Sequence, residues 1–374
     1  MRRLATDGIC MAGVSLALVL SAATIAPTAE TNSLTPSLQR VPAHASITPN
    51  HTTDSNPQSA DDLIRQAITA IAAEEYAAAE SMLRQVISAE PNNAIAHHLL
   101  GQSLTNQAEI DGTNESHRLR LAQAETAYQE AMQLDPNLEE AFVDLIGPLY
   151  QGRRFHEMEV IIRAVIRINP NNSEYYEALA TMIAAIHPPE IAIAKLRDEI
   201  ATFEDQSAFY LQLSIVHELE DRDAESEAVL REGIQIHPTA AKLYRHLGYK
   251  LTRQARYTEA ISIHQAEVQL NPDSPYPYRN LAEAFKGANR LEEAEAAYRA
   301  GVTQNPNSLF IHHELADFLS EQAQYEEAEI VYRTATQIVE GPEKMVAFSR
   351  LHQFLRSQGR IEEANNLDFQ QITD

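Results

Sequence analysis

The sequence predicts an all-α solenoid, and three observations favour this fold class. Five prolines, Pro136, Pro170, Pro238, Pro272 and Pro306, are separated by 34, 68, 34 and 34 residues. Bulky and small apolar residues recur between them in one order, and the chain has no tryptophan and no long alternating apolar run. Units that repeat at about 34 residues cannot bury their apolar faces alone, so neighbouring units must stack around one continuous core.

Each repeat is expected to form two amphipathic helices joined by a turn. In residues 275–308, Leu281 and Phe285 belong to the first helix, and Ala294 and Tyr298 belong to the second. Large residues at spacings of three and four form a buried stripe, and the small residues let the paired helix approach. The proline ends the second helix because the residue before a proline is pushed out of the helical region.

These positions resemble the tetratricopeptide repeat (TPR) family, which implies a right-handed superhelical solenoid of helix–turn–helix units. The resemblance covers residues 60–374 and gives nine units. The first eight units are residues 60–93, 94–138, 139–172, 173–206, 207–240, 241–274, 275–308 and 309–342, and residues 345–374 form a terminal cap.

Three units depart from the family pattern. Unit 94–138 carries 11 extra residues, and its polar segment 106–118 is expected to be an exposed loop. Unit 173–206 contains His187-Pro188-Pro189, which should end its first helix. The last unit follows two additional residues in Glu340-Gly341-Pro342, and its second helix carries the polar cap residues Asn365, Asn366, Asp368 and Gln371.

The segment before the repeats predicts an exported protein. Residues 1–29 have a basic start, an apolar stretch and small residues suited to cleavage, so we expect an export signal and a periplasmic location. An uncleaved membrane anchor is the alternative. Residues 30–59 are rich in Pro, Ser and Thr and are expected to be a flexible spacer. The single cysteine, Cys10, lies inside the signal, so the mature chain would have no thiol.

Composition excludes several functions. A net charge of −24 disfavours nucleic acid, and it leaves membrane contact only through an uncleaved signal or a membrane-protein partner. The chain has no glycine-rich phosphate loop, HExxH motif, nucleophile elbow or Cys-x-x-Cys pair, so we expect no enzyme activity and no required cofactor.

The TPR resemblance implies that the first helix of each unit lines a concave groove. The residues that it places in that groove are Lys242, Arg245, His246, Tyr249 and Arg253 in one unit, and Arg279, Asn280 and Lys286 in the next. Arg350 and Arg356 could extend this basic patch. Such side chains can hold the carboxylates of a peptide or protein tail through charge-assisted hydrogen bonds. Alternatively, they pair with local acids such as Glu283 and keep the groove soluble.

Two acidic groups are candidate metal ligands. One contains Glu140, Asp144, Glu174 and Glu177, with His98 one unit earlier, and the other contains His313, Glu314 and Asp317. Oxygen ligands with an occasional imidazole suit Mn²⁺, Mg²⁺ or Ca²⁺. A solvated acidic face without metal is the alternative.

Three functions are compatible with these features. The first is a non-enzymatic exported scaffold that captures a peptide or protein tail and assists the assembly of a membrane complex. Second, the repeat number, export signal and acidity resemble the cyanobacterial periplasmic processing-associated TPR proteins. That resemblance implies photosystem II assembly with binding of the D1 subunit and Mn²⁺. The third is a component of cell-envelope assembly or polysaccharide export.

Overall fold

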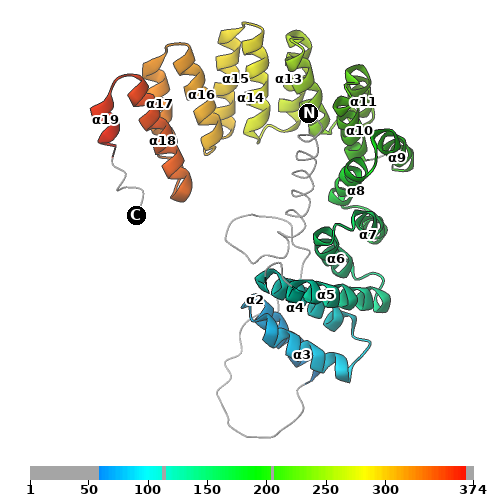
Figure 1. Ribbon diagram of the computed structural model, residues 1–374. Helices are drawn as coiled ribbons and strands as arrows, with labels where there is room; N and C mark the ends of the chain where they lie inside the picture. The colour runs from blue at the N-terminus through cyan, green and yellow to red at the C-terminus, as the bar shows by residue number, and fades with distance from the viewer. Residues whose placement is uncertain (1–58, 112–114, 204–205, 368–374) are drawn as a thin grey trace. The chain divides into compact units, whose positions relative to one another are not determined.

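The computed structural model describes residues 59–111, 115–203 and 206–367, and these residues form eighteen helices and no strand (Figure 1). The all-α prediction is confirmed. The first helices of the repeats, called A helices, are α2 (Ala60–Ala72), α4 (Ala94–Asp111), α6 (Glu139–Gln151), α8 (Ser173–Ile186), α10 (Ser207–Leu219), α12 (Ala241–Arg253), α14 (Pro275–Gly287), α16 (Leu309–Glu321) and α18 (Gly341–Ser357). The second helices, called B helices, are α3 (Tyr76–Ala89), α5 (Glu115–Leu134), α7 (Phe155–Ile168), α9 (Pro189–Thr202), α11 (Asp223–Ile236), α13 (Tyr257–Leu270), α15 (Leu291–Gln304), α17 (Tyr325–Ala335) and α19 (Ile361–Asn365).

Several predictions concern residues outside the described part of the chain. They are the export signal at 1–29, the spacer as far as residue 58, and the cap residues Asp368 and Gln371. Among the described helices, none is both long and apolar enough to cross a membrane.

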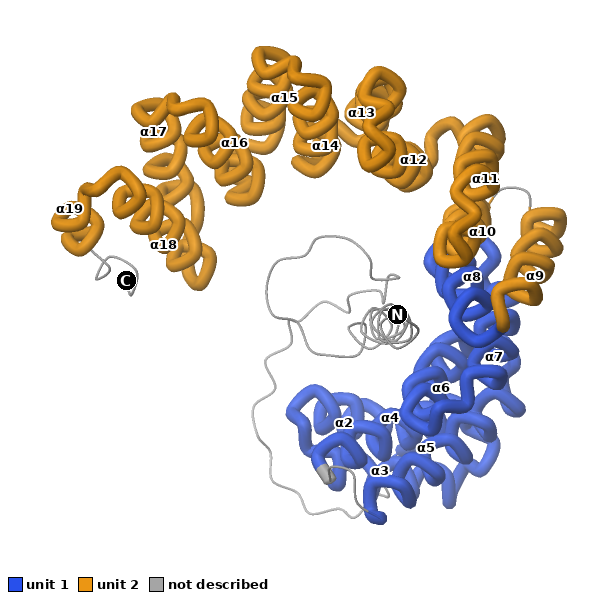
Figure 2. Tube along the Cα trace, turned by 45° about the horizontal axis from the view of Figure 1, so that its top comes forward, with its two compact units in different colours: residues 1–187 blue, residues 188–374 orange. Residues whose placement is uncertain are grey.

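The chain divides into two compact units, residues 1–187 and 188–374 (Figure 2). Within each unit, an A helix packs on the B helix that follows it, as in the pairs α4–α5 and α14–α15. Successive A helices also touch, as α4 and α6 do in unit 1, and α12, α14 and α16 in unit 2. The division falls inside the repeat predicted at 173–206, where the sequence indicated one uninterrupted array.

The prolines end the B helices at the expected place. Helices α5, α7, α11, α13 and α15 each end two residues before the proline of their repeat. The helical conformation is disfavoured for the residue before a proline because the ring clashes with that residue's backbone and Cβ. The 34-residue proline spacing is therefore also the spacing of the helix ends.

The turn from the A helix to the B helix has a recurrent backbone conformation. One residue in each of six turns has φ between 56° and 61°: Glu74, Arg153, Asp221, Ala255, Asn289 and Ala323. In the turn at His187-Pro188-Pro189, by contrast, His187 has φ of −105°. Helix α8 ends at Ile186, as the sequence predicted, and Pro189 begins α9, where its missing N–H leaves no hydrogen bond unmade. The boundary between the two units lies at this irregular turn.

The prediction that residues 106–118 form an exposed loop was wrong. Helix α4 runs to Asp111 and α5 starts at Glu115, so the extra residues lengthen both helices. The buried side chains of Leu104 and Ala108 continue the apolar stripe beyond the usual helix end. The amide of Gln107 donates to Glu80 at 3.0 Å and accepts from Arg120 at 2.8 Å, which joins the hairpin to α3.

The two extra residues before the last unit also join a helix. Helix α18 begins at Gly341, four residues before the predicted start at 345, with a proline in its first turn. A proline is accepted there because the first backbone N–H groups of a helix have no partner within the helix.

An arginine in the turn bridges successive repeats. Arg256, before α13, lies 2.6 Å from Glu227 of α11 and 2.7 Å from Glu259 of α13. Its hydrogen bond lowers the pKa of Glu227. Arg154 and Arg360 occupy the same place in their repeats and bridge the B helices in the same way.

Small residues allow the A and B helices to approach closely, as predicted. A Cβ atom added at Gly101 of α4 would lie 2.6 Å from the ring of Tyr128 of α5. One added at Gly248 of α12 would lie 2.4 Å from the ring of His264 of α13. Both rings are almost completely buried. A bulky B-helix side chain therefore rests directly on the A-helix backbone.

We expect the Gly101→Ala change to lower the free energy of unfolding by about 1–2 kcal/mol, because overpacking outweighs the better helix propensity of alanine. In a Tyr128→Leu background, the same change should be neutral or stabilising because the smaller side chain leaves room. Urea unfolding followed by circular dichroism measures both effects. An equal cost in the two backgrounds would contradict the close contact.

Candidate peptide-binding surface

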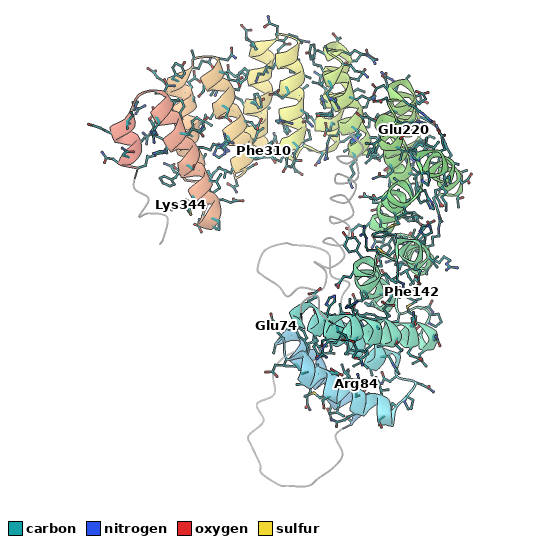
Figure 3. The ribbon with its side chains drawn as sticks, in the orientation of Figure 1. Glu74, Arg84, Phe142, Glu220, Phe310 and Lys344 are labelled. Carbon is teal, nitrogen blue, oxygen red and sulfur yellow. The ribbon has the colours of Figure 1, made fainter. Side chains whose placement is uncertain are left out.

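The eight residues predicted to bind a peptide lie on two neighbouring A helices of unit 2. Helix α12 carries Lys242, Arg245, His246, Tyr249 and Arg253, and α14 carries Arg279, Asn280 and Lys286, a set called here the basic A-face. Spacings of three and four place the α12 residues on one side of that helix, and Arg279 and Lys286, seven residues apart, share one side of α14. Helix α12 contacts α14. None of the eight is buried. Figure 3 draws the side chains of the described helices and labels Phe310 on the neighbouring helix α16.

Arg245 compensates a buried charge. The carboxylate of Glu267 on α13 is completely buried, and its Oε1 lies 3.2 Å from Nε of Arg245. The other oxygen lies 3.0 Å from Nδ1 of His264. A buried carboxylate is stable only when cations or hydrogen bonds compensate it. The structure therefore gives Arg245 a role in the fold that the sequence analysis did not foresee.

The cations of α14 pair with the next A helix. Nε of Arg279 lies 3.5 Å from Oε2 of Glu314, and Nζ of Lys286 lies 2.6 Å from Oε2 of Glu321. Both carboxylates belong to α16. Arg279 and Lys286 are seven residues apart on α14, and Glu314 and Glu321 are seven residues apart on α16. The alternative of pairing with local acids is thus present in the structure, and Glu283 itself lies 3.8 Å from Lys286.

Arg253 of α12 pairs with the preceding A helix. Nη1 of Arg253 lies 3.6 Å from Glu218 of α10, and its guanidinium carbon lies 5.9 Å from the ring centre of Tyr249. Burial lowers the pKa of His246, so this imidazole adds no charge at neutral pH. Helices α12 and α14, which are in contact, both carry basic residues, and Glu283 is the one acidic residue of these two helices.

Tyrosines of the B helices fix two A-helix carboxylates. The Tyr298 hydroxyl donates to Glu283 at 2.6 Å, and the Tyr332 hydroxyl donates to Asp317. Burial, together with the charges of Glu283 and Asp317, raises the pKa of Glu314. An acid with a raised pKa gives up its negative charge more readily, so its pair with Arg279 is sensitive to mild acid.

The candidate metal ligands of unit 2 are engaged with other groups. Glu314 pairs with Arg279, and Asp317 accepts from Tyr332 and lies 3.6 Å from Arg350. His313 is buried, and burial followed by the charge of Arg350 lowers its pKa to about 4.

In unit 1, Nε2 of His98 lies 2.9 Å from Oδ2 of Asp144, so the structure brings these two predicted residues together. Glu140 lies on α6 with Asp144, and Glu174 and Glu177 lie on α8. In the described part of the chain, no group of three or more His, Cys, Asp or Glu could hold a metal ion. Metal binding stays a prediction.

The sequence analysis missed two features of this surface. Glu267 stands where the next two repeats have Gly301 and Ala335, and a charged residue at a position that is otherwise small could have indicated the buried carboxylate. The rings of Tyr276 and Phe310 lie side by side on α14 and α16, with centres 5.0 Å apart. Tyr276 is half exposed, so the pair offers an apolar contact beside Arg279.

Comparison with known proteins finds similar solved structures of low sequence identity. No protein-family model and no curated protein matches it. The chain is similar to the crystal structure of the MamA protein, with 18% identity over 44% of this chain and 91% of that chain and a TM-score of 0.34. It is also similar to the crystal structure of yeast Tom70, with 14% identity over 83% of this chain and 67% of that chain and a TM-score of 0.47.

A third similar structure is MamA 41-end from Desulfovibrio magneticus RS-1, with 17% identity over 45% of this chain and 95% of that chain and a TM-score of 0.36. These TM-scores are low, so the fold is identified from the chain's own repeat. Its helix pairs, small-residue contacts and terminal prolines are those of an all-α solenoid of helix–turn–helix repeats.

We expect the Arg245→Ala change to lower the free energy of unfolding by about 3 kcal/mol, because it leaves the buried Glu267 without its guanidinium. The matched change Arg253→Ala on the same helix should cost less than about 0.5 kcal/mol, because that pair is exposed. Denaturant unfolding of the two variants shows whether Arg245 is a structural partner of Glu267 or an exposed surface cation like Arg253. Equal costs would mean that Arg245 is not a structural partner.

The lowered pKa of His313 predicts a pH-dependent stability. The folded chain holds this imidazole neutral, whereas the unfolded chain takes up a proton near the ordinary pKa of about 6.5. The contribution of His313 to the free energy of unfolding is fully present above that pH. It decreases by up to about 3 kcal/mol as the pH falls toward 4. Unfolding of the wild type, His313→Leu and the exposed control His156→Gln at pH 7 and pH 4.5 tests this. Only His313→Leu should lose less stability than the wild type.

Proposed function

We propose that the protein is an exported, non-enzymatic scaffold that captures an acidic peptide or protein tail on the basic A-face of unit 2. We further propose that it acts in the periplasm as an assembly factor for a membrane complex. The observation that carries the binding proposal is the contact between two basic A helices, α12 and α14, in a chain with a net charge of −24. The ion pairs that Arg279 and Lys286 make with α16 are partly exposed, so an anionic ligand can reach these cations.

The chemistry of the basic A-face suits carboxylates. Arg279 offers a guanidinium that is only loosely held at 3.5 Å from Glu314, and the neighbouring Asn280 offers an amide. A ligand carboxylate can compete with the exposed Glu321 for Lys286 and can share Arg279 with Glu314, because a guanidinium has several N–H donors. The exposed ring of Tyr276, with Phe310 behind it, can contact an apolar side chain of the ligand.

Export and location are supported by the sequence of residues 1–29. A basic start followed by an apolar stretch and small residues is the pattern of a cleaved export signal. A scaffold without thiols in its mature part suits an oxidising compartment. An assembly role follows from the proposal that the chain binds a protein tail and has no reaction of its own.

The binding proposal is tested with a fluorescein-labelled peptide of twelve alternating Glu and Ala residues that ends in a free carboxylate. We expect the Arg279→Gln/Lys286→Gln variant of the full chain to bind it about tenfold more weakly than the wild type, because two charge-assisted contacts are lost. The control Lys195→Gln/Arg197→Gln removes the same charge from α9. It should bind like the wild type in fluorescence anisotropy. Equal affinities of all three proteins would contradict the proposal.

A further inference from the structure

The A helices of unit 1 have a charge pattern opposite to that of unit 2. Helices α4, α6 and α8 contain no Lys or Arg, and the one arginine of α2, Arg65, is paired with Asp62 at 2.5 Å. The arginines of unit 1's other described helices lie on B helices, as Arg84, Arg120 and Arg163 do. The A helices α6 and α8 nevertheless carry five carboxylates: Glu139, Glu140, Asp144, Glu174 and Glu177.

Some of these carboxylates have partners within the protein. Glu139 accepts hydrogen bonds from the Tyr175 hydroxyl and, at 3.2 Å, from the Asn169 amide. Asp144 is next to His98. Glu140 and Glu174 are different, because they lie 34 residues apart at the same position of successive repeats and no Lys or Arg of the described chain pairs with either. Both Glu140 and Glu174 are exposed.

An apolar surface accompanies these two carboxylates. Ile64, Ile68 and Ile71 follow one another at spacings of four and three, so they lie on one side of α2. Ile68 is 49% exposed, and the other two are partly exposed. Helix α2 contacts α4, which in turn contacts α6.

On α6, Val143, Gly147 and Tyr150 stand at the repeat positions that Ile64, Ile68 and Ile71 occupy on α2. Val143 and Tyr150 on α6 are partly exposed. A Cβ atom added at Gly147, between them in sequence, would meet nothing within 4 Å, so the surface of α6 is open there.

We propose that this surface of unit 1, made by Ile64, Ile68 and Ile71 of α2, Val143 and Tyr150 of α6 and the carboxylates Glu140 and Glu174, binds a protein segment that combines basic and apolar side chains. We call it the acidic A-face. Lys or Arg side chains of the segment pair with Glu140 and Glu174, and its apolar side chains cover the isoleucines. Charge complementarity selects this occupant, because no cation of the A helices α4, α6 and α8 opposes it.

A basic segment fits better than a single metal ion. Helix α6, which carries Glu140, does not contact α8, which carries Glu174, so the two carboxylates are suited to two separate cationic side chains. An anionic ligand is repelled by the same carboxylates. The acidic A-face is independent of the basic A-face of unit 2, so each can be tested while the other is intact. Together they would let one chain hold two segments of opposite charge.

The test uses the full chain and a fluorescein-labelled 14-residue amphipathic peptide made only of Leu and Lys. We expect the Glu140→Gln/Glu174→Gln variant to bind this peptide about five- to tenfold more weakly than the wild type, because two exposed ion pairs are lost. Its binding should also depend less on salt, because salt screens exposed pairs. The control Glu130→Gln/Glu220→Gln removes the same charge outside the acidic A-face and should bind like the wild type.

Two further variants test the apolar contact and the independence from unit 2 separately. Ile68→Ser should weaken binding of the Leu/Lys peptide about threefold but leave a Ser/Lys peptide of equal charge unaffected, because only the first peptide loses an apolar contact. Arg279→Gln/Lys286→Gln should leave Leu/Lys binding unchanged whether or not the acidic peptide binds to unit 2.

Three results would overturn the assignment. One is a wild type that does not bind the Leu/Lys peptide, and another is a Glu140→Gln/Glu174→Gln variant that binds it as tightly as the wild type. The third is equal weakening by the control pair, which would show that only the net charge of the chain attracts the peptide.

Discussion

The structure depends on the close approach of each A helix to its B helix. Tyr128 against Gly101 and His264 against Gly248 leave no space for a methyl group between ring and backbone. Packing of this density fixes the distance between the two helices, since interiors tolerate few voids and little overlap. Once a helix pair is rigid, the exposed side of its A helix has fixed positions, and side chains 34 residues apart occupy equivalent places. The chemistry of each surface then depends on which residues stand at those places.

Two kinds of A-helix surface result from this arrangement. In unit 2, cations of α14 face carboxylates of α16, and Arg245 is held by the buried Glu267. In unit 1, α4, α6 and α8 have carboxylates and no Lys or Arg. The same backbone repeat therefore supports opposite charges, because the exposed positions of the A helices differ from repeat to repeat. A scaffold of this kind can discriminate between partners by charge without a change of fold.

The sequence was sufficient for the features that short-range rules determine. The B-helix ends follow from prolines such as Pro272, and the end of α8 follows from Pro188 and Pro189, because each acts on the residue before it. The added length of α4 was not foreseen, since the polar residues of segment 106–118 resemble a loop while Gln107 and Ala108 are buried in the structure.

The candidate site was predictable in its location and less so in its interactions. The spacing of Arg279 and Lys286 indicated a shared helix face, which the structure has. Their pairing with Glu314 and Glu321 depends on the register between α14 and α16, and this cannot be read from either helix alone. The role of Arg245 depends on Glu267, 22 residues later, and on the complete burial of that carboxylate.

The most direct test of the account is hydrogen–deuterium exchange of the full chain with each of the two probe peptides. If unit 2 binds acidic segments and unit 1 binds basic ones, the Glu/Ala peptide slows exchange in α12 and α14, and the Leu/Lys peptide slows exchange in α2, α6 and α8. Protection of the same helices by both peptides, or protection confined to B helices, would contradict it.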